Sequence, residues 1–596
     1  MENLPAIFLR TVGRLGERTA AQHFEGGHWR ESTWSELEER ARARAAGLLA
    51  RGIRPGDRVA LMAQTSLDWI VCELAIHFTG AVCVPIYATL LAEDIAYLVN
   101  DSGSRLAFVQ GRELLTRFEE KRPSMPDLEG VILMEGEGDG EWVSDLPQLR
   151  QQGERHLADH PEGLEERLAG IQADDVAHFI YTSGTTGPPK GVVLTHANWA
   201  FEAKATEAVG LVGPEDQSLA FLPLAHSYAQ VLKTVWFTLG HPTCFARDLT
   251  TIVEDMAHAR PTVMAGVPRI FEKVHAKIVA TGMASPGLKG VLFAQAMRQV
   301  DAYAAARRSG RRYASPGFFL MKRLVFTKLA ARLKELFGGR LRFFVSGGAP
   351  LSPTIAYFFE LCGVEILEGY GLTETSAAST VCRPGRNKIG TVGIPVPGVE
   401  VKIAEDGEVL IRGPHIMRGY HGKPEATAEV LEPDGWFHSG DIGRLDDEGY
   451  LKITDRKKDL IVTAGGKNIA PQNIENRLKA YPLISQAVVH GDRRKFLTAL
   501  VTLDEEAAAK VAEEARSPAR GLAELSVDSA VKAAVAAAVA DLNGSLASYE
   551  TIKKHAILPY ELSQEGGELT PSLKVKRRVL ETRHAELLDG FYDEKY

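Results

Sequence analysis

The chain contains 596 residues, of which 45% are hydrophobic and 24% are charged, and its net charge is 69 − 77 = −8. This composition is typical of globular proteins and excludes disordered, collagen-like and coiled-coil chains. An acidic chain of this size is not a general nucleic-acid binder. At roughly 150 residues per domain the length predicts about four units, or fewer where the units are large α/β domains.

The first long apolar segment, residues 70–92, is long enough to raise the question of a membrane span. Gly80 and Pro85 interrupt it, and Glu73 would have no partner in lipid. The segment therefore predicts a buried helix followed by a buried strand over residues 81–87. The amino-terminal residues lack the basic and apolar regions of a secretory signal. Isolated cysteines without zinc or redox spacing favour a reducing cytoplasm: Cys72, Cys83, Cys244, Cys362 and Cys382.

Three short apolar runs further along the chain each end in a glycine-rich loop. They cover residues 177–181, 341–346 and 365–368. Such runs alternate with helical patterns, which indicates largely parallel sheets covered by helices on both faces. Because ligands of these sheets bind at the carboxyl ends of the strands, we expect the three loops to converge on one site.

Two further segments complete the predicted organisation. Residues 281–337 are basic and helical and are typical of an insertion between core elements. After a short polar link at residues 454–457, a smaller α+β pattern begins. Its predicted elements are a hairpin (459–463 and 467–470), a helix from Pro471, two strands (486–490 and 496–503) and an alanine-rich helix (531–542). The predicted fold is α/β: a large N-terminal domain (1–454) with mostly parallel sheets flanked by helices, and a small mobile α+β C-terminal domain (455–596).

The strongest chemical signal is the loop Tyr-Thr-Ser-Gly-Thr-Thr-Gly-Pro-Pro-Lys-Gly at residues 181–191. Its glycines let backbone N–H groups approach a polyphosphate, its hydroxyls donate hydrogen bonds, and Lys190 neutralises charge. A Walker A loop, and with it a Walker-type kinase, is disfavoured because Pro189-Lys190-Gly191 stands where Gly-Lys-Ser/Thr is required. The alternative is a flexible exposed loop that binds no ligand. It is disfavoured because eleven consecutive positions match the pattern of a phosphate-binding loop.

This loop resembles the phosphate-binding signature of the adenylate-forming superfamily, which includes acyl-CoA synthetases, luciferases and peptide-synthetase adenylation domains. Four other signatures follow in the same order. Residues 370–375 (YGLTET) resemble the adenine and magnesium motif, residues 436–441 (WFHSGD) the ribose motif, residues 455–459 (DRKKD) the interdomain hinge, and residues 569–577 (LTPSLKVKR) the catalytic-lysine motif. The resemblance covers nearly the whole chain.

The resemblance implies roles for individual residues. Lys574 would bridge the attacking carboxylate and the α-phosphate, and Thr185 and Glu374 would hold Mg²⁺ and take part in catalysis. Tyr370 would stack on adenine and Asp441 would accept hydrogen bonds from the ribose. The implied ATP- and CoA-contacting residues are Thr182, Ser183, Gly184, Thr185, Thr186, Gly187, Lys190, Gly348, Ala349, Pro350, Glu368, Gly369, Tyr370, Gly371, Thr373, Asp441, Ile453, Arg456 and Lys467.

Within the superfamily, the chain is similar to long-chain fatty acyl-CoA synthetases. Residues 222–227 (LPLAHS), residues 267–273 (VPRIFEK) and the basic insertion are the similar segments. His226 would either line the acyl or carboxylate site or serve structure alone, and both readings stay open. One departure concerns the tryptophan gate that some bacterial relatives carry four residues later. That position is Gln230 here, so the gate cannot be transferred and acyl length stays open.

The implied reaction uses ATP, Mg²⁺, a fatty acid and CoA, without nucleic acid. A fatty carboxylate attacks ATP to give acyl-adenylate and pyrophosphate. The small domain then rotates about Asp455, and CoA, contacted by the hairpin that carries Lys467, expels AMP. The expected location is the cytoplasm. Peripheral contact with the inner membrane face stays open, because the basic side chains of the insertion could touch anionic lipid or form a solvated face. A homodimer also stays open.

Other functions remain as alternatives. A fatty acyl-AMP ligase would pass the acyl group to a carrier protein, and a medium-chain or aryl acid CoA ligase would share the chemistry. A peptide-synthetase adenylation domain is often fused to a carrier, and the sequence has none. A non-catalytic lipid-binding protein is disfavoured by the intact motif residues Lys190, Glu374, Asp441 and Lys574.

Overall fold

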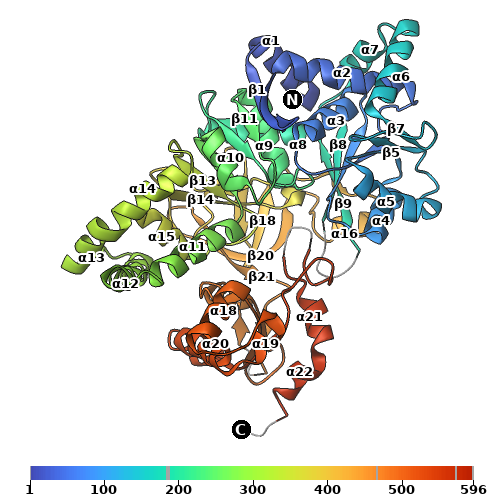
Figure 1. Ribbon diagram of the computed structural model, residues 1–596. Coiled ribbons are helices and arrows are strands. Elements are labelled where there is room, and N and C mark those ends of the chain that lie inside the picture. Colours follow the sequence, from blue (N-terminus) through green and yellow to red (C-terminus); the bar gives the residue numbers. More distant parts are fainter. Residues whose placement is uncertain (1, 183–187, 465–466, 571–573, 594–596) are drawn as a thin grey trace.

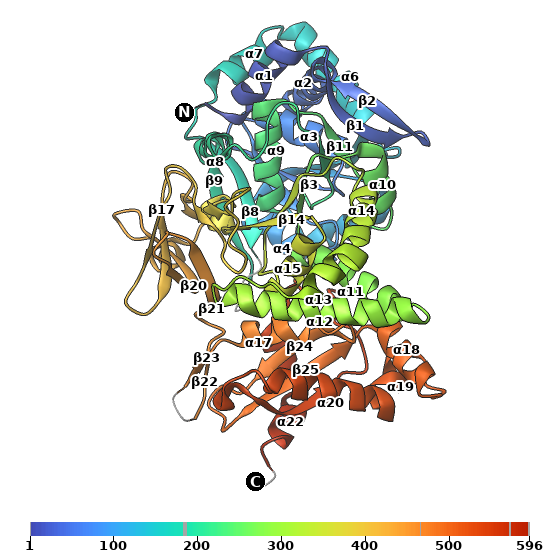
Figure 2. The same ribbon diagram turned by 90° about the vertical axis from the view of Figure 1, so that its left-hand side faces the viewer.

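The computed structural model describes residues 2–182, 188–464, 467–570 and 574–593. Figure 1 shows a large N-terminal part above a smaller C-terminal part, and the view turned by 90° in Figure 2 shows the same division. The α/β class and the two-part organisation that the sequence predicts are confirmed. Among the described residues, no helix combines the length and the apolar character that a membrane crossing requires.

The largest sheet has eight strands in the order β19-β9-β8-β4-β3-β5-β6-β7. The strands from β8 to β7 in this order are parallel. At one edge, β9 is antiparallel to β8, and β19 is antiparallel to β9. The bounds are β3 (Arg58–Met62), β4 (Val82–Ile86), β5 (Ser104–Val109), β6 (Gly130–Leu133), β7 (Val143–Asp145), β8 (Val176–Thr182), β9 (Lys190–Thr195) and β19 (Gly419–Tyr420). The apolar segment 70–92 forms helix α3 (Leu67–Phe78) and the fully buried strand β4, as predicted.

Two mixed sheets and one antiparallel sheet complete the large part. One contains β12 (Val263–Gly266), β13 (Phe343–Ser346), β14 (Glu365–Tyr370), β15 (Thr380–Val381) and β16 (Ile394–Pro395). A second contains β10 (Ser218–Ala220), β11 (Thr243–Phe245), β1 (Thr19–Glu25) and β2 (His28–Thr33). The antiparallel sheet, which the alternating pattern did not predict, contains β17 (Glu400–Ile403), β18 (Glu408–Arg412), β20 (Phe437–Leu445) and β21 (Leu451–Arg456).

Helices cover these sheets. Those of the large part outside the insertion are α1 (Leu4–Leu15), α2 (Trp34–Ala50), α3, α4 (Ala92–Ser102), α5 (Arg112–Lys121), α6 (Leu146–Asp159), α7 (Gly163–Gly170), α8 (His196–Val209), α9 (Ser227–Leu239), α10 (Ile252–Ala259), α15 (Pro353–Leu361) and α16 (Pro424–Ala428). The predicted insertion is helical: α11 (Pro268–Met283) leads into α12 (Leu288–Arg308), α13 (Pro316–Met321), a π-helical turn (Lys322–Phe326) and α14 (Thr327–Leu336). In Figure 2, α12 lies along the side of the large part that faces the C-terminal part.

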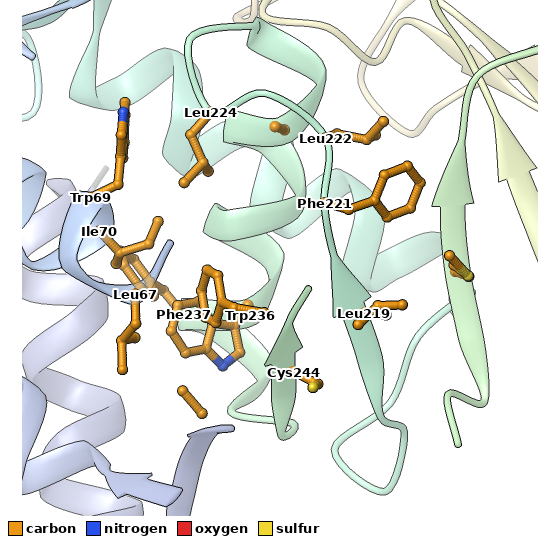
Figure 3. Packing of buried hydrophobic residues seen from close by; sticks show 14 of the residues in the cluster. Leu67, Trp69, Ile70, Leu219, Phe221, Leu222, Leu224, Trp236, Phe237 and Cys244 are labelled. Atoms are coloured by element: carbon orange, nitrogen blue, oxygen red, sulfur yellow. The ribbon is translucent and has the colours of Figure 1, made fainter. Parts of the chain in front are cut away.

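The main hydrophobic core joins α3, α9 and the strands β10 and β11 (Figure 3). Trp236 and Phe237 of α9 pack with ring centroids 5.2 Å apart, and Leu67, Trp69 and Ile70 of α3 lie in the same core. Removing such apolar area from water contributes about 25 cal/mol per Å². All five cysteines are buried free thiols.

A charged network lies fully buried between α3, α9 and β8. Glu73 of α3 accepts hydrogen bonds from Lys233 of α9 at 2.5 Å and from Nε2 of His178 in β8 at 2.7 Å. Trp199 donates its indole N–H to Nδ1 of His178 at 3.0 Å, which places the imidazole proton on Nε2. The exposed fraction is 0% for Glu73 and 4% for Lys233. The network thus ties the helix that begins after His226 to the strand that ends at Thr182.

The C-terminal part has its own core, formed by residues that lie between Ile461 and Ile552. Its elements are the hairpin β22 (Ile461–Val462) and β23 (Asn468–Ile469), the sheet β24 (Ile484–His490), β25 (Leu497–Leu503) and β26 (Ile552–Ile557), and the helices α17 (Pro471–Leu478), α18 (Glu505–Glu514), α19 (Gly521–Val527), α20 (Ser529–Asn543), α21 (Arg577–Arg583) and α22 (Ala585–Gly590). The predicted polar link at 454–457 is not a separate loop, because residues 454–456 end strand β21.

Arg269, in the first turn of α11, connects the two parts. Its guanidinium donates to the backbone carbonyl of Ser485 at 3.1 Å and to the Ser485 hydroxyl at 2.9 Å. The Ser485 hydroxyl in turn donates to Glu561 at 2.9 Å. Ser485 belongs to β24, so these bonds hold the C-terminal sheet against the large part in this structure.

Candidate active site

A cavity of about 330 Å³ lies where the predicted loops meet. Its wall includes the end of β8, the loops after β13 and β14, the start of α9, and, from the C-terminal part, Gln564, residues 569–570 and residues 574–576. The cavity is therefore built at the carboxyl ends of parallel strands, where ligands of α/β sheets bind. Predicted site residues that line it are Thr182, His226, Gly348, Gly369, Tyr370, Gly371, Thr373, Glu374, Arg456 and Lys574.

The phosphate-loop prediction can be placed only at its two ends. Thr182 lines the cavity, and Lys190 begins β9. The Lys190 ammonium lies 4.7 Å from the ring centroid of Tyr420, whose hydroxyl donates to Glu374 at 2.8 Å. Tyr420 thus contacts a cation through its ring and a carboxylate through its hydroxyl. The predicted residues Ser183, Gly184, Thr185, Thr186 and Gly187 lie outside the described residues.

Tyr420 is a site residue that the sequence interpretation missed. It reaches the site because β19 pairs with β9 in an antiparallel register, with Tyr420 opposite Val192. Burial and the Glu374 carboxylate raise the pKa of Tyr420, so its hydroxyl stays protonated and donates to Glu374. No local pattern marks a two-residue strand that pairs with a segment more than 200 residues earlier.

Tyr370, Asp441 and Arg456 form one connected group. The Tyr370 hydroxyl donates to Oδ2 of Asp441 at 2.7 Å, and Nε of Arg456 lies 3.2 Å from Oδ1 of the same carboxylate. Asp441 in β20 and Arg456 in β21 are register partners, which explains why the ribose and hinge motifs meet. Burial, together with the Asp441 charge, raises the pKa of Tyr370 well above its ordinary value. Tyr370 and Arg456 line the cavity, with Asp441 behind them.

Four other predicted nucleotide contacts, Ala349, Pro350, Glu368 and Ile453, do not line the cavity. Glu368 is buried and accepts the backbone N–H of Leu351 at 3.2 Å, so it holds the loop that contains Gly348, Ala349 and Pro350. Burial raises the pKa of Glu368 to about 7. Ile453 packs with the apolar cluster around β17 and β18.

Lys574 enters the cavity from the C-terminal part. Its backbone N–H donates to the Thr570 hydroxyl at 3.0 Å, and the Thr570 N–H donates to the Lys574 carbonyl at 2.8 Å. The Lys574 side chain is open to the cavity. Protein atoms nevertheless surround its ammonium group and partly desolvate it. Desolvation, reinforced by the positive charge of Arg456, lowers the pKa of Lys574 to about 8.

His226 caps helix α9, where its Nδ1 accepts the backbone N–H of Tyr228 at 3.1 Å. Burial lowers the pKa of His226 to about 4, and the Lys574 charge acts in the same direction. The imidazole is therefore neutral near pH 7 and lines the cavity with a structural bond already made. Gln230 is buried one turn further, where it donates to the Leu224 carbonyl at 2.7 Å and accepts from Lys233 at 2.5 Å.

Lys467 lies away from the cavity in this structure. It is exposed, with its ammonium 5.8 Å from the ring centroid of Tyr549. Both residues belong to the C-terminal part. A contact between Lys467 and a ligand in the cavity would require a different placement of that part.

Comparison with known proteins gives consistent matches. Residues 8–421 match the family described as AMP-binding enzyme, and residues 458–596 match the AMP-binding enzyme C-terminal domain. A curated relative, the long-chain-fatty-acid–CoA ligase FadD15 of Mycobacterium bovis, is 39% identical over 580 residues, which cover 96% of this chain and 94% of that protein.

Two solved structures share the fold. The adenylation domain of a carboxylate reductase from Mycobacterium chelonae has a TM-score of 0.75 at 23% identity, covering 100% of this chain and 91% of that one. The O-succinylbenzoate CoA synthetase of Bacillus subtilis, solved with ATP and magnesium ion, has a TM-score of 0.67 at 20% identity, covering 96% of this chain and 99% of that one.

Proposed function

The chain belongs to the AMP-binding enzyme family, and from this membership we infer that it activates a long-chain fatty acid with ATP and transfers the acyl group to CoA. The products are acyl-CoA, AMP and pyrophosphate. The observation that carries the inference is the shared cavity, where Lys574 of the C-terminal part meets Thr182 and Glu374 of the large part. The 39% identity to a long-chain-fatty-acid–CoA ligase, over 96% of the chain, favours this reaction over those of an acyl-AMP ligase or an aryl acid ligase.

In the first step, the fatty carboxylate attacks the α-phosphorus of ATP and pyrophosphate leaves. Lys574 would lie between the carboxylate and the α-phosphate and stabilise the charge that develops there. Thr182 and Lys190 would hold phosphate oxygens. A carboxylate accepts about four hydrogen bonds, so Asp441 can keep its two present partners and still accept ribose hydroxyls.

Glu374 is the described residue that fits a magnesium ion. It is a half-buried carboxylate in the cavity wall, and oxygen donors of this kind are the ligands that Mg²⁺ prefers. The hydrogen bond from Tyr420 to Oε1 holds the carboxylate in place and leaves Oε2 available to the ion. When bound, Mg²⁺ would offset the charge of the phosphate oxygens.

In the second step, the C-terminal part would rotate about Asp455, so we place the domain boundary between residues 454 and 455. Rotation would withdraw Lys574, bring the hairpin with Lys467 toward the thioester site, and break the Arg269–Ser485 bonds. CoA thiolate would then attack the acyl carbonyl and expel AMP. The unpaired cysteines support a cytoplasmic location.

The proposed function is tested by pyrophosphate release from Mg·ATP with saturated fatty acids of increasing length, with and without CoA. We expect CoA-stimulated turnover that peaks at long chains. Accumulation of acyl-adenylate, with a rate of pyrophosphate release that CoA does not change, would instead identify an acyl-AMP ligase. An absence of release with every acid would contradict the proposal.

The lowered pKa of Lys574 predicts how adenylate formation depends on pH. The protonated ammonium is the active form, so kcat/KM for pyrophosphate release should be constant below pH 8 and fall about tenfold per pH unit above it. Lys574→Arg is the control, because a guanidinium stays protonated and should remove this descending limb. A wild-type profile that stays flat to pH 9.5 would contradict the assignment.

A further inference from the structure

Asp101, in the last turn of α4, joins three segments of the large part. Its Oδ2 accepts the hydroxyl of Tyr181 in β8 at 2.8 Å, and its Oδ1 accepts the ammonium of Lys423 at 2.8 Å. Lys423 lies between β19 and α16, and Figure 1 shows α4 and α16 beside β9. A carboxylate in the last turn of a helix interacts unfavourably with the helix dipole, so the stability of α4 does not explain Asp101.

Tyr97, one turn earlier on the same face of α4, contacts the other side of the predicted phosphate loop. Its hydroxyl donates to the backbone carbonyl of Pro189 at 2.9 Å. Pro189 directly precedes Lys190, just as Tyr181 directly precedes Thr182, and Thr182 and Lys190 are register partners in β8 and β9. Two side chains of α4 therefore hold the chain one residue before each of the two phosphate contacts that the structure describes.

The same carboxylate also fixes β19. The ring of Tyr181 packs directly on Gly191, where a Cβ atom would lie 3.1 Å from the ring. The Gly191 carbonyl accepts the backbone N–H of His421 at 2.8 Å, and two residues further the chain returns to Asp101 through Lys423. Strand β19 is thereby tied to the same side chain as β8.

The group formed by Tyr97, Asp101, Tyr181 and Lys423, which we call the Asp101 clasp, is largely buried. The exposed fraction is 18% for the Asp101 side chain and 28% for that of Lys423. The hydrogen bond to Asp101 raises the pKa of Lys423, and burial together with the Asp101 carboxylate raises the pKa of Tyr181. Both donors therefore stay protonated at neutral pH, and charge-assisted bonds of this kind are stronger than neutral ones. Of these four residues only Tyr181 lines the cavity, so Asp101 acts there through its neighbours.

We propose that Asp101 is a positioning residue for the triphosphate of ATP. The Asp101 clasp holds Thr182 and Lys190 at the spacing in which both reach phosphate oxygens. Groups that are already held in the binding geometry bind a ligand more tightly, because less conformational freedom is lost on binding. The inference rests on the proposed function, in which Thr182 and Lys190 hold those oxygens.

Asp101→Asn tests the inference, because the amide keeps the shape of the side chain but turns one acceptor into a donor that faces Tyr181 or Lys423. Calorimetry with Mg·ATP, without acid or CoA, should give a Kd about tenfold or more above that of the wild type, the effect of losing a hydrogen bond to a charged group. The KM for ATP in pyrophosphate release should rise by the same factor while kcat changes by less than about threefold, because a ground-state contact that persists in the transition state is weakened equally in both. Lys423→Met should have the same effect, and the double variant should bind ATP as the single variants do, because both changes break one bond.

Asp57→Asn is the matched control. Asp57 is 20% exposed, accepts the guanidinium of Arg105 at 2.5 Å and does not line the cavity, so its variant should bind Mg·ATP as the wild type does. An Asp101→Asn variant with an unchanged Kd would overturn the inference alone, and a lowered free energy of unfolding in that variant, measured in urea, would then show that the clasp only supports the fold. A wild-type protein that binds no Mg·ATP would overturn the proposed function and the inference together.

Discussion

Lys574→Ala should lower the rate of adenylate formation about a hundredfold to a thousandfold, the effect of removing a comparable charge-stabilising donor, or about 3–4 kcal/mol. The Lys574 ammonium group is a positive charge that the C-terminal part brings to a cavity whose wall comes mostly from the large part. Thioester formation from supplied acyl-adenylate should be largely spared, because Lys574 would have left the cavity in that step. The measurement compares the two half-reactions, pyrophosphate release and acyl-CoA formation, in the same preparation.

Arg578→Ala is the matched control for this prediction. Arg578 lies in the same basic run but is exposed in α21 and does not line the cavity. Both half-reactions should survive its replacement. Equal loss of the two half-reactions in Lys574→Ala would show that the lysine supports structure or general binding, and the catalytic assignment would then be wrong.

Lys233→Met should lower the free energy of unfolding of the large part by about 3–5 kcal/mol, because it leaves Glu73 charged in the core with His178 as its remaining partner. Both charges are fully removed from water, so the carboxylate cannot recover hydration when the ammonium is lost. Burial opposes both charged forms, but the Lys233 charge is the main influence that lowers the pKa of Glu73. Urea unfolding followed by tryptophan fluorescence measures the effect.

Two comparisons isolate the charge. Glu73→Gln combined with Lys233→Met removes both charges and should recover most of the lost stability. Arg150→Met breaks a surface pair with Glu154, at 2.8 Å and more than 60% exposed on both sides, and should change stability by less than about 1 kcal/mol. A Lys233→Met variant no less stable than Arg150→Met would show that the buried network contributes little.

The cavity could be predicted from sequence because its parts are local. Strands β8, β13 and β14 contain short apolar runs, each of which leads into a glycine-rich stretch of sequence, and parallel strands bring those ends together. The roles of Lys574 and Asp441 came from the motif resemblance and stay predictions, although the structure brings Lys574, Tyr370 and Arg456 to one cavity.

What the sequence did not predict depends on contacts between distant segments. The Glu73–Lys233 pair joins residues 160 positions apart, and Tyr420 reaches Glu374 through strand pairing rather than through any local pattern. Strand β21 did carry a signal: in Leu-Lys-Ile-Thr-Asp-Arg the buried Leu451 and Asp455 alternate with more exposed neighbours. The charged residues Asp455 and Arg456 favoured the interpretation of residues 454–457 as a polar link. They instead belong to the strand, because pairing with β20 satisfies their backbone hydrogen-bonding groups.

The five buried cysteines have a practical consequence. Burial raises the pKa of every thiol, to about 11 in Cys72 and Cys382 and to about 12 in Cys244 and Cys362, and well above the ordinary value in Cys83. Thiolate is the reactive form, so the folded chain should remain unlabelled by maleimide dyes. A pair of surface cysteines, one introduced on each side of Asp455, would therefore carry a donor and an acceptor fluorophore without removal of any native thiol, and the domain alternation could be followed in real time during single turnovers.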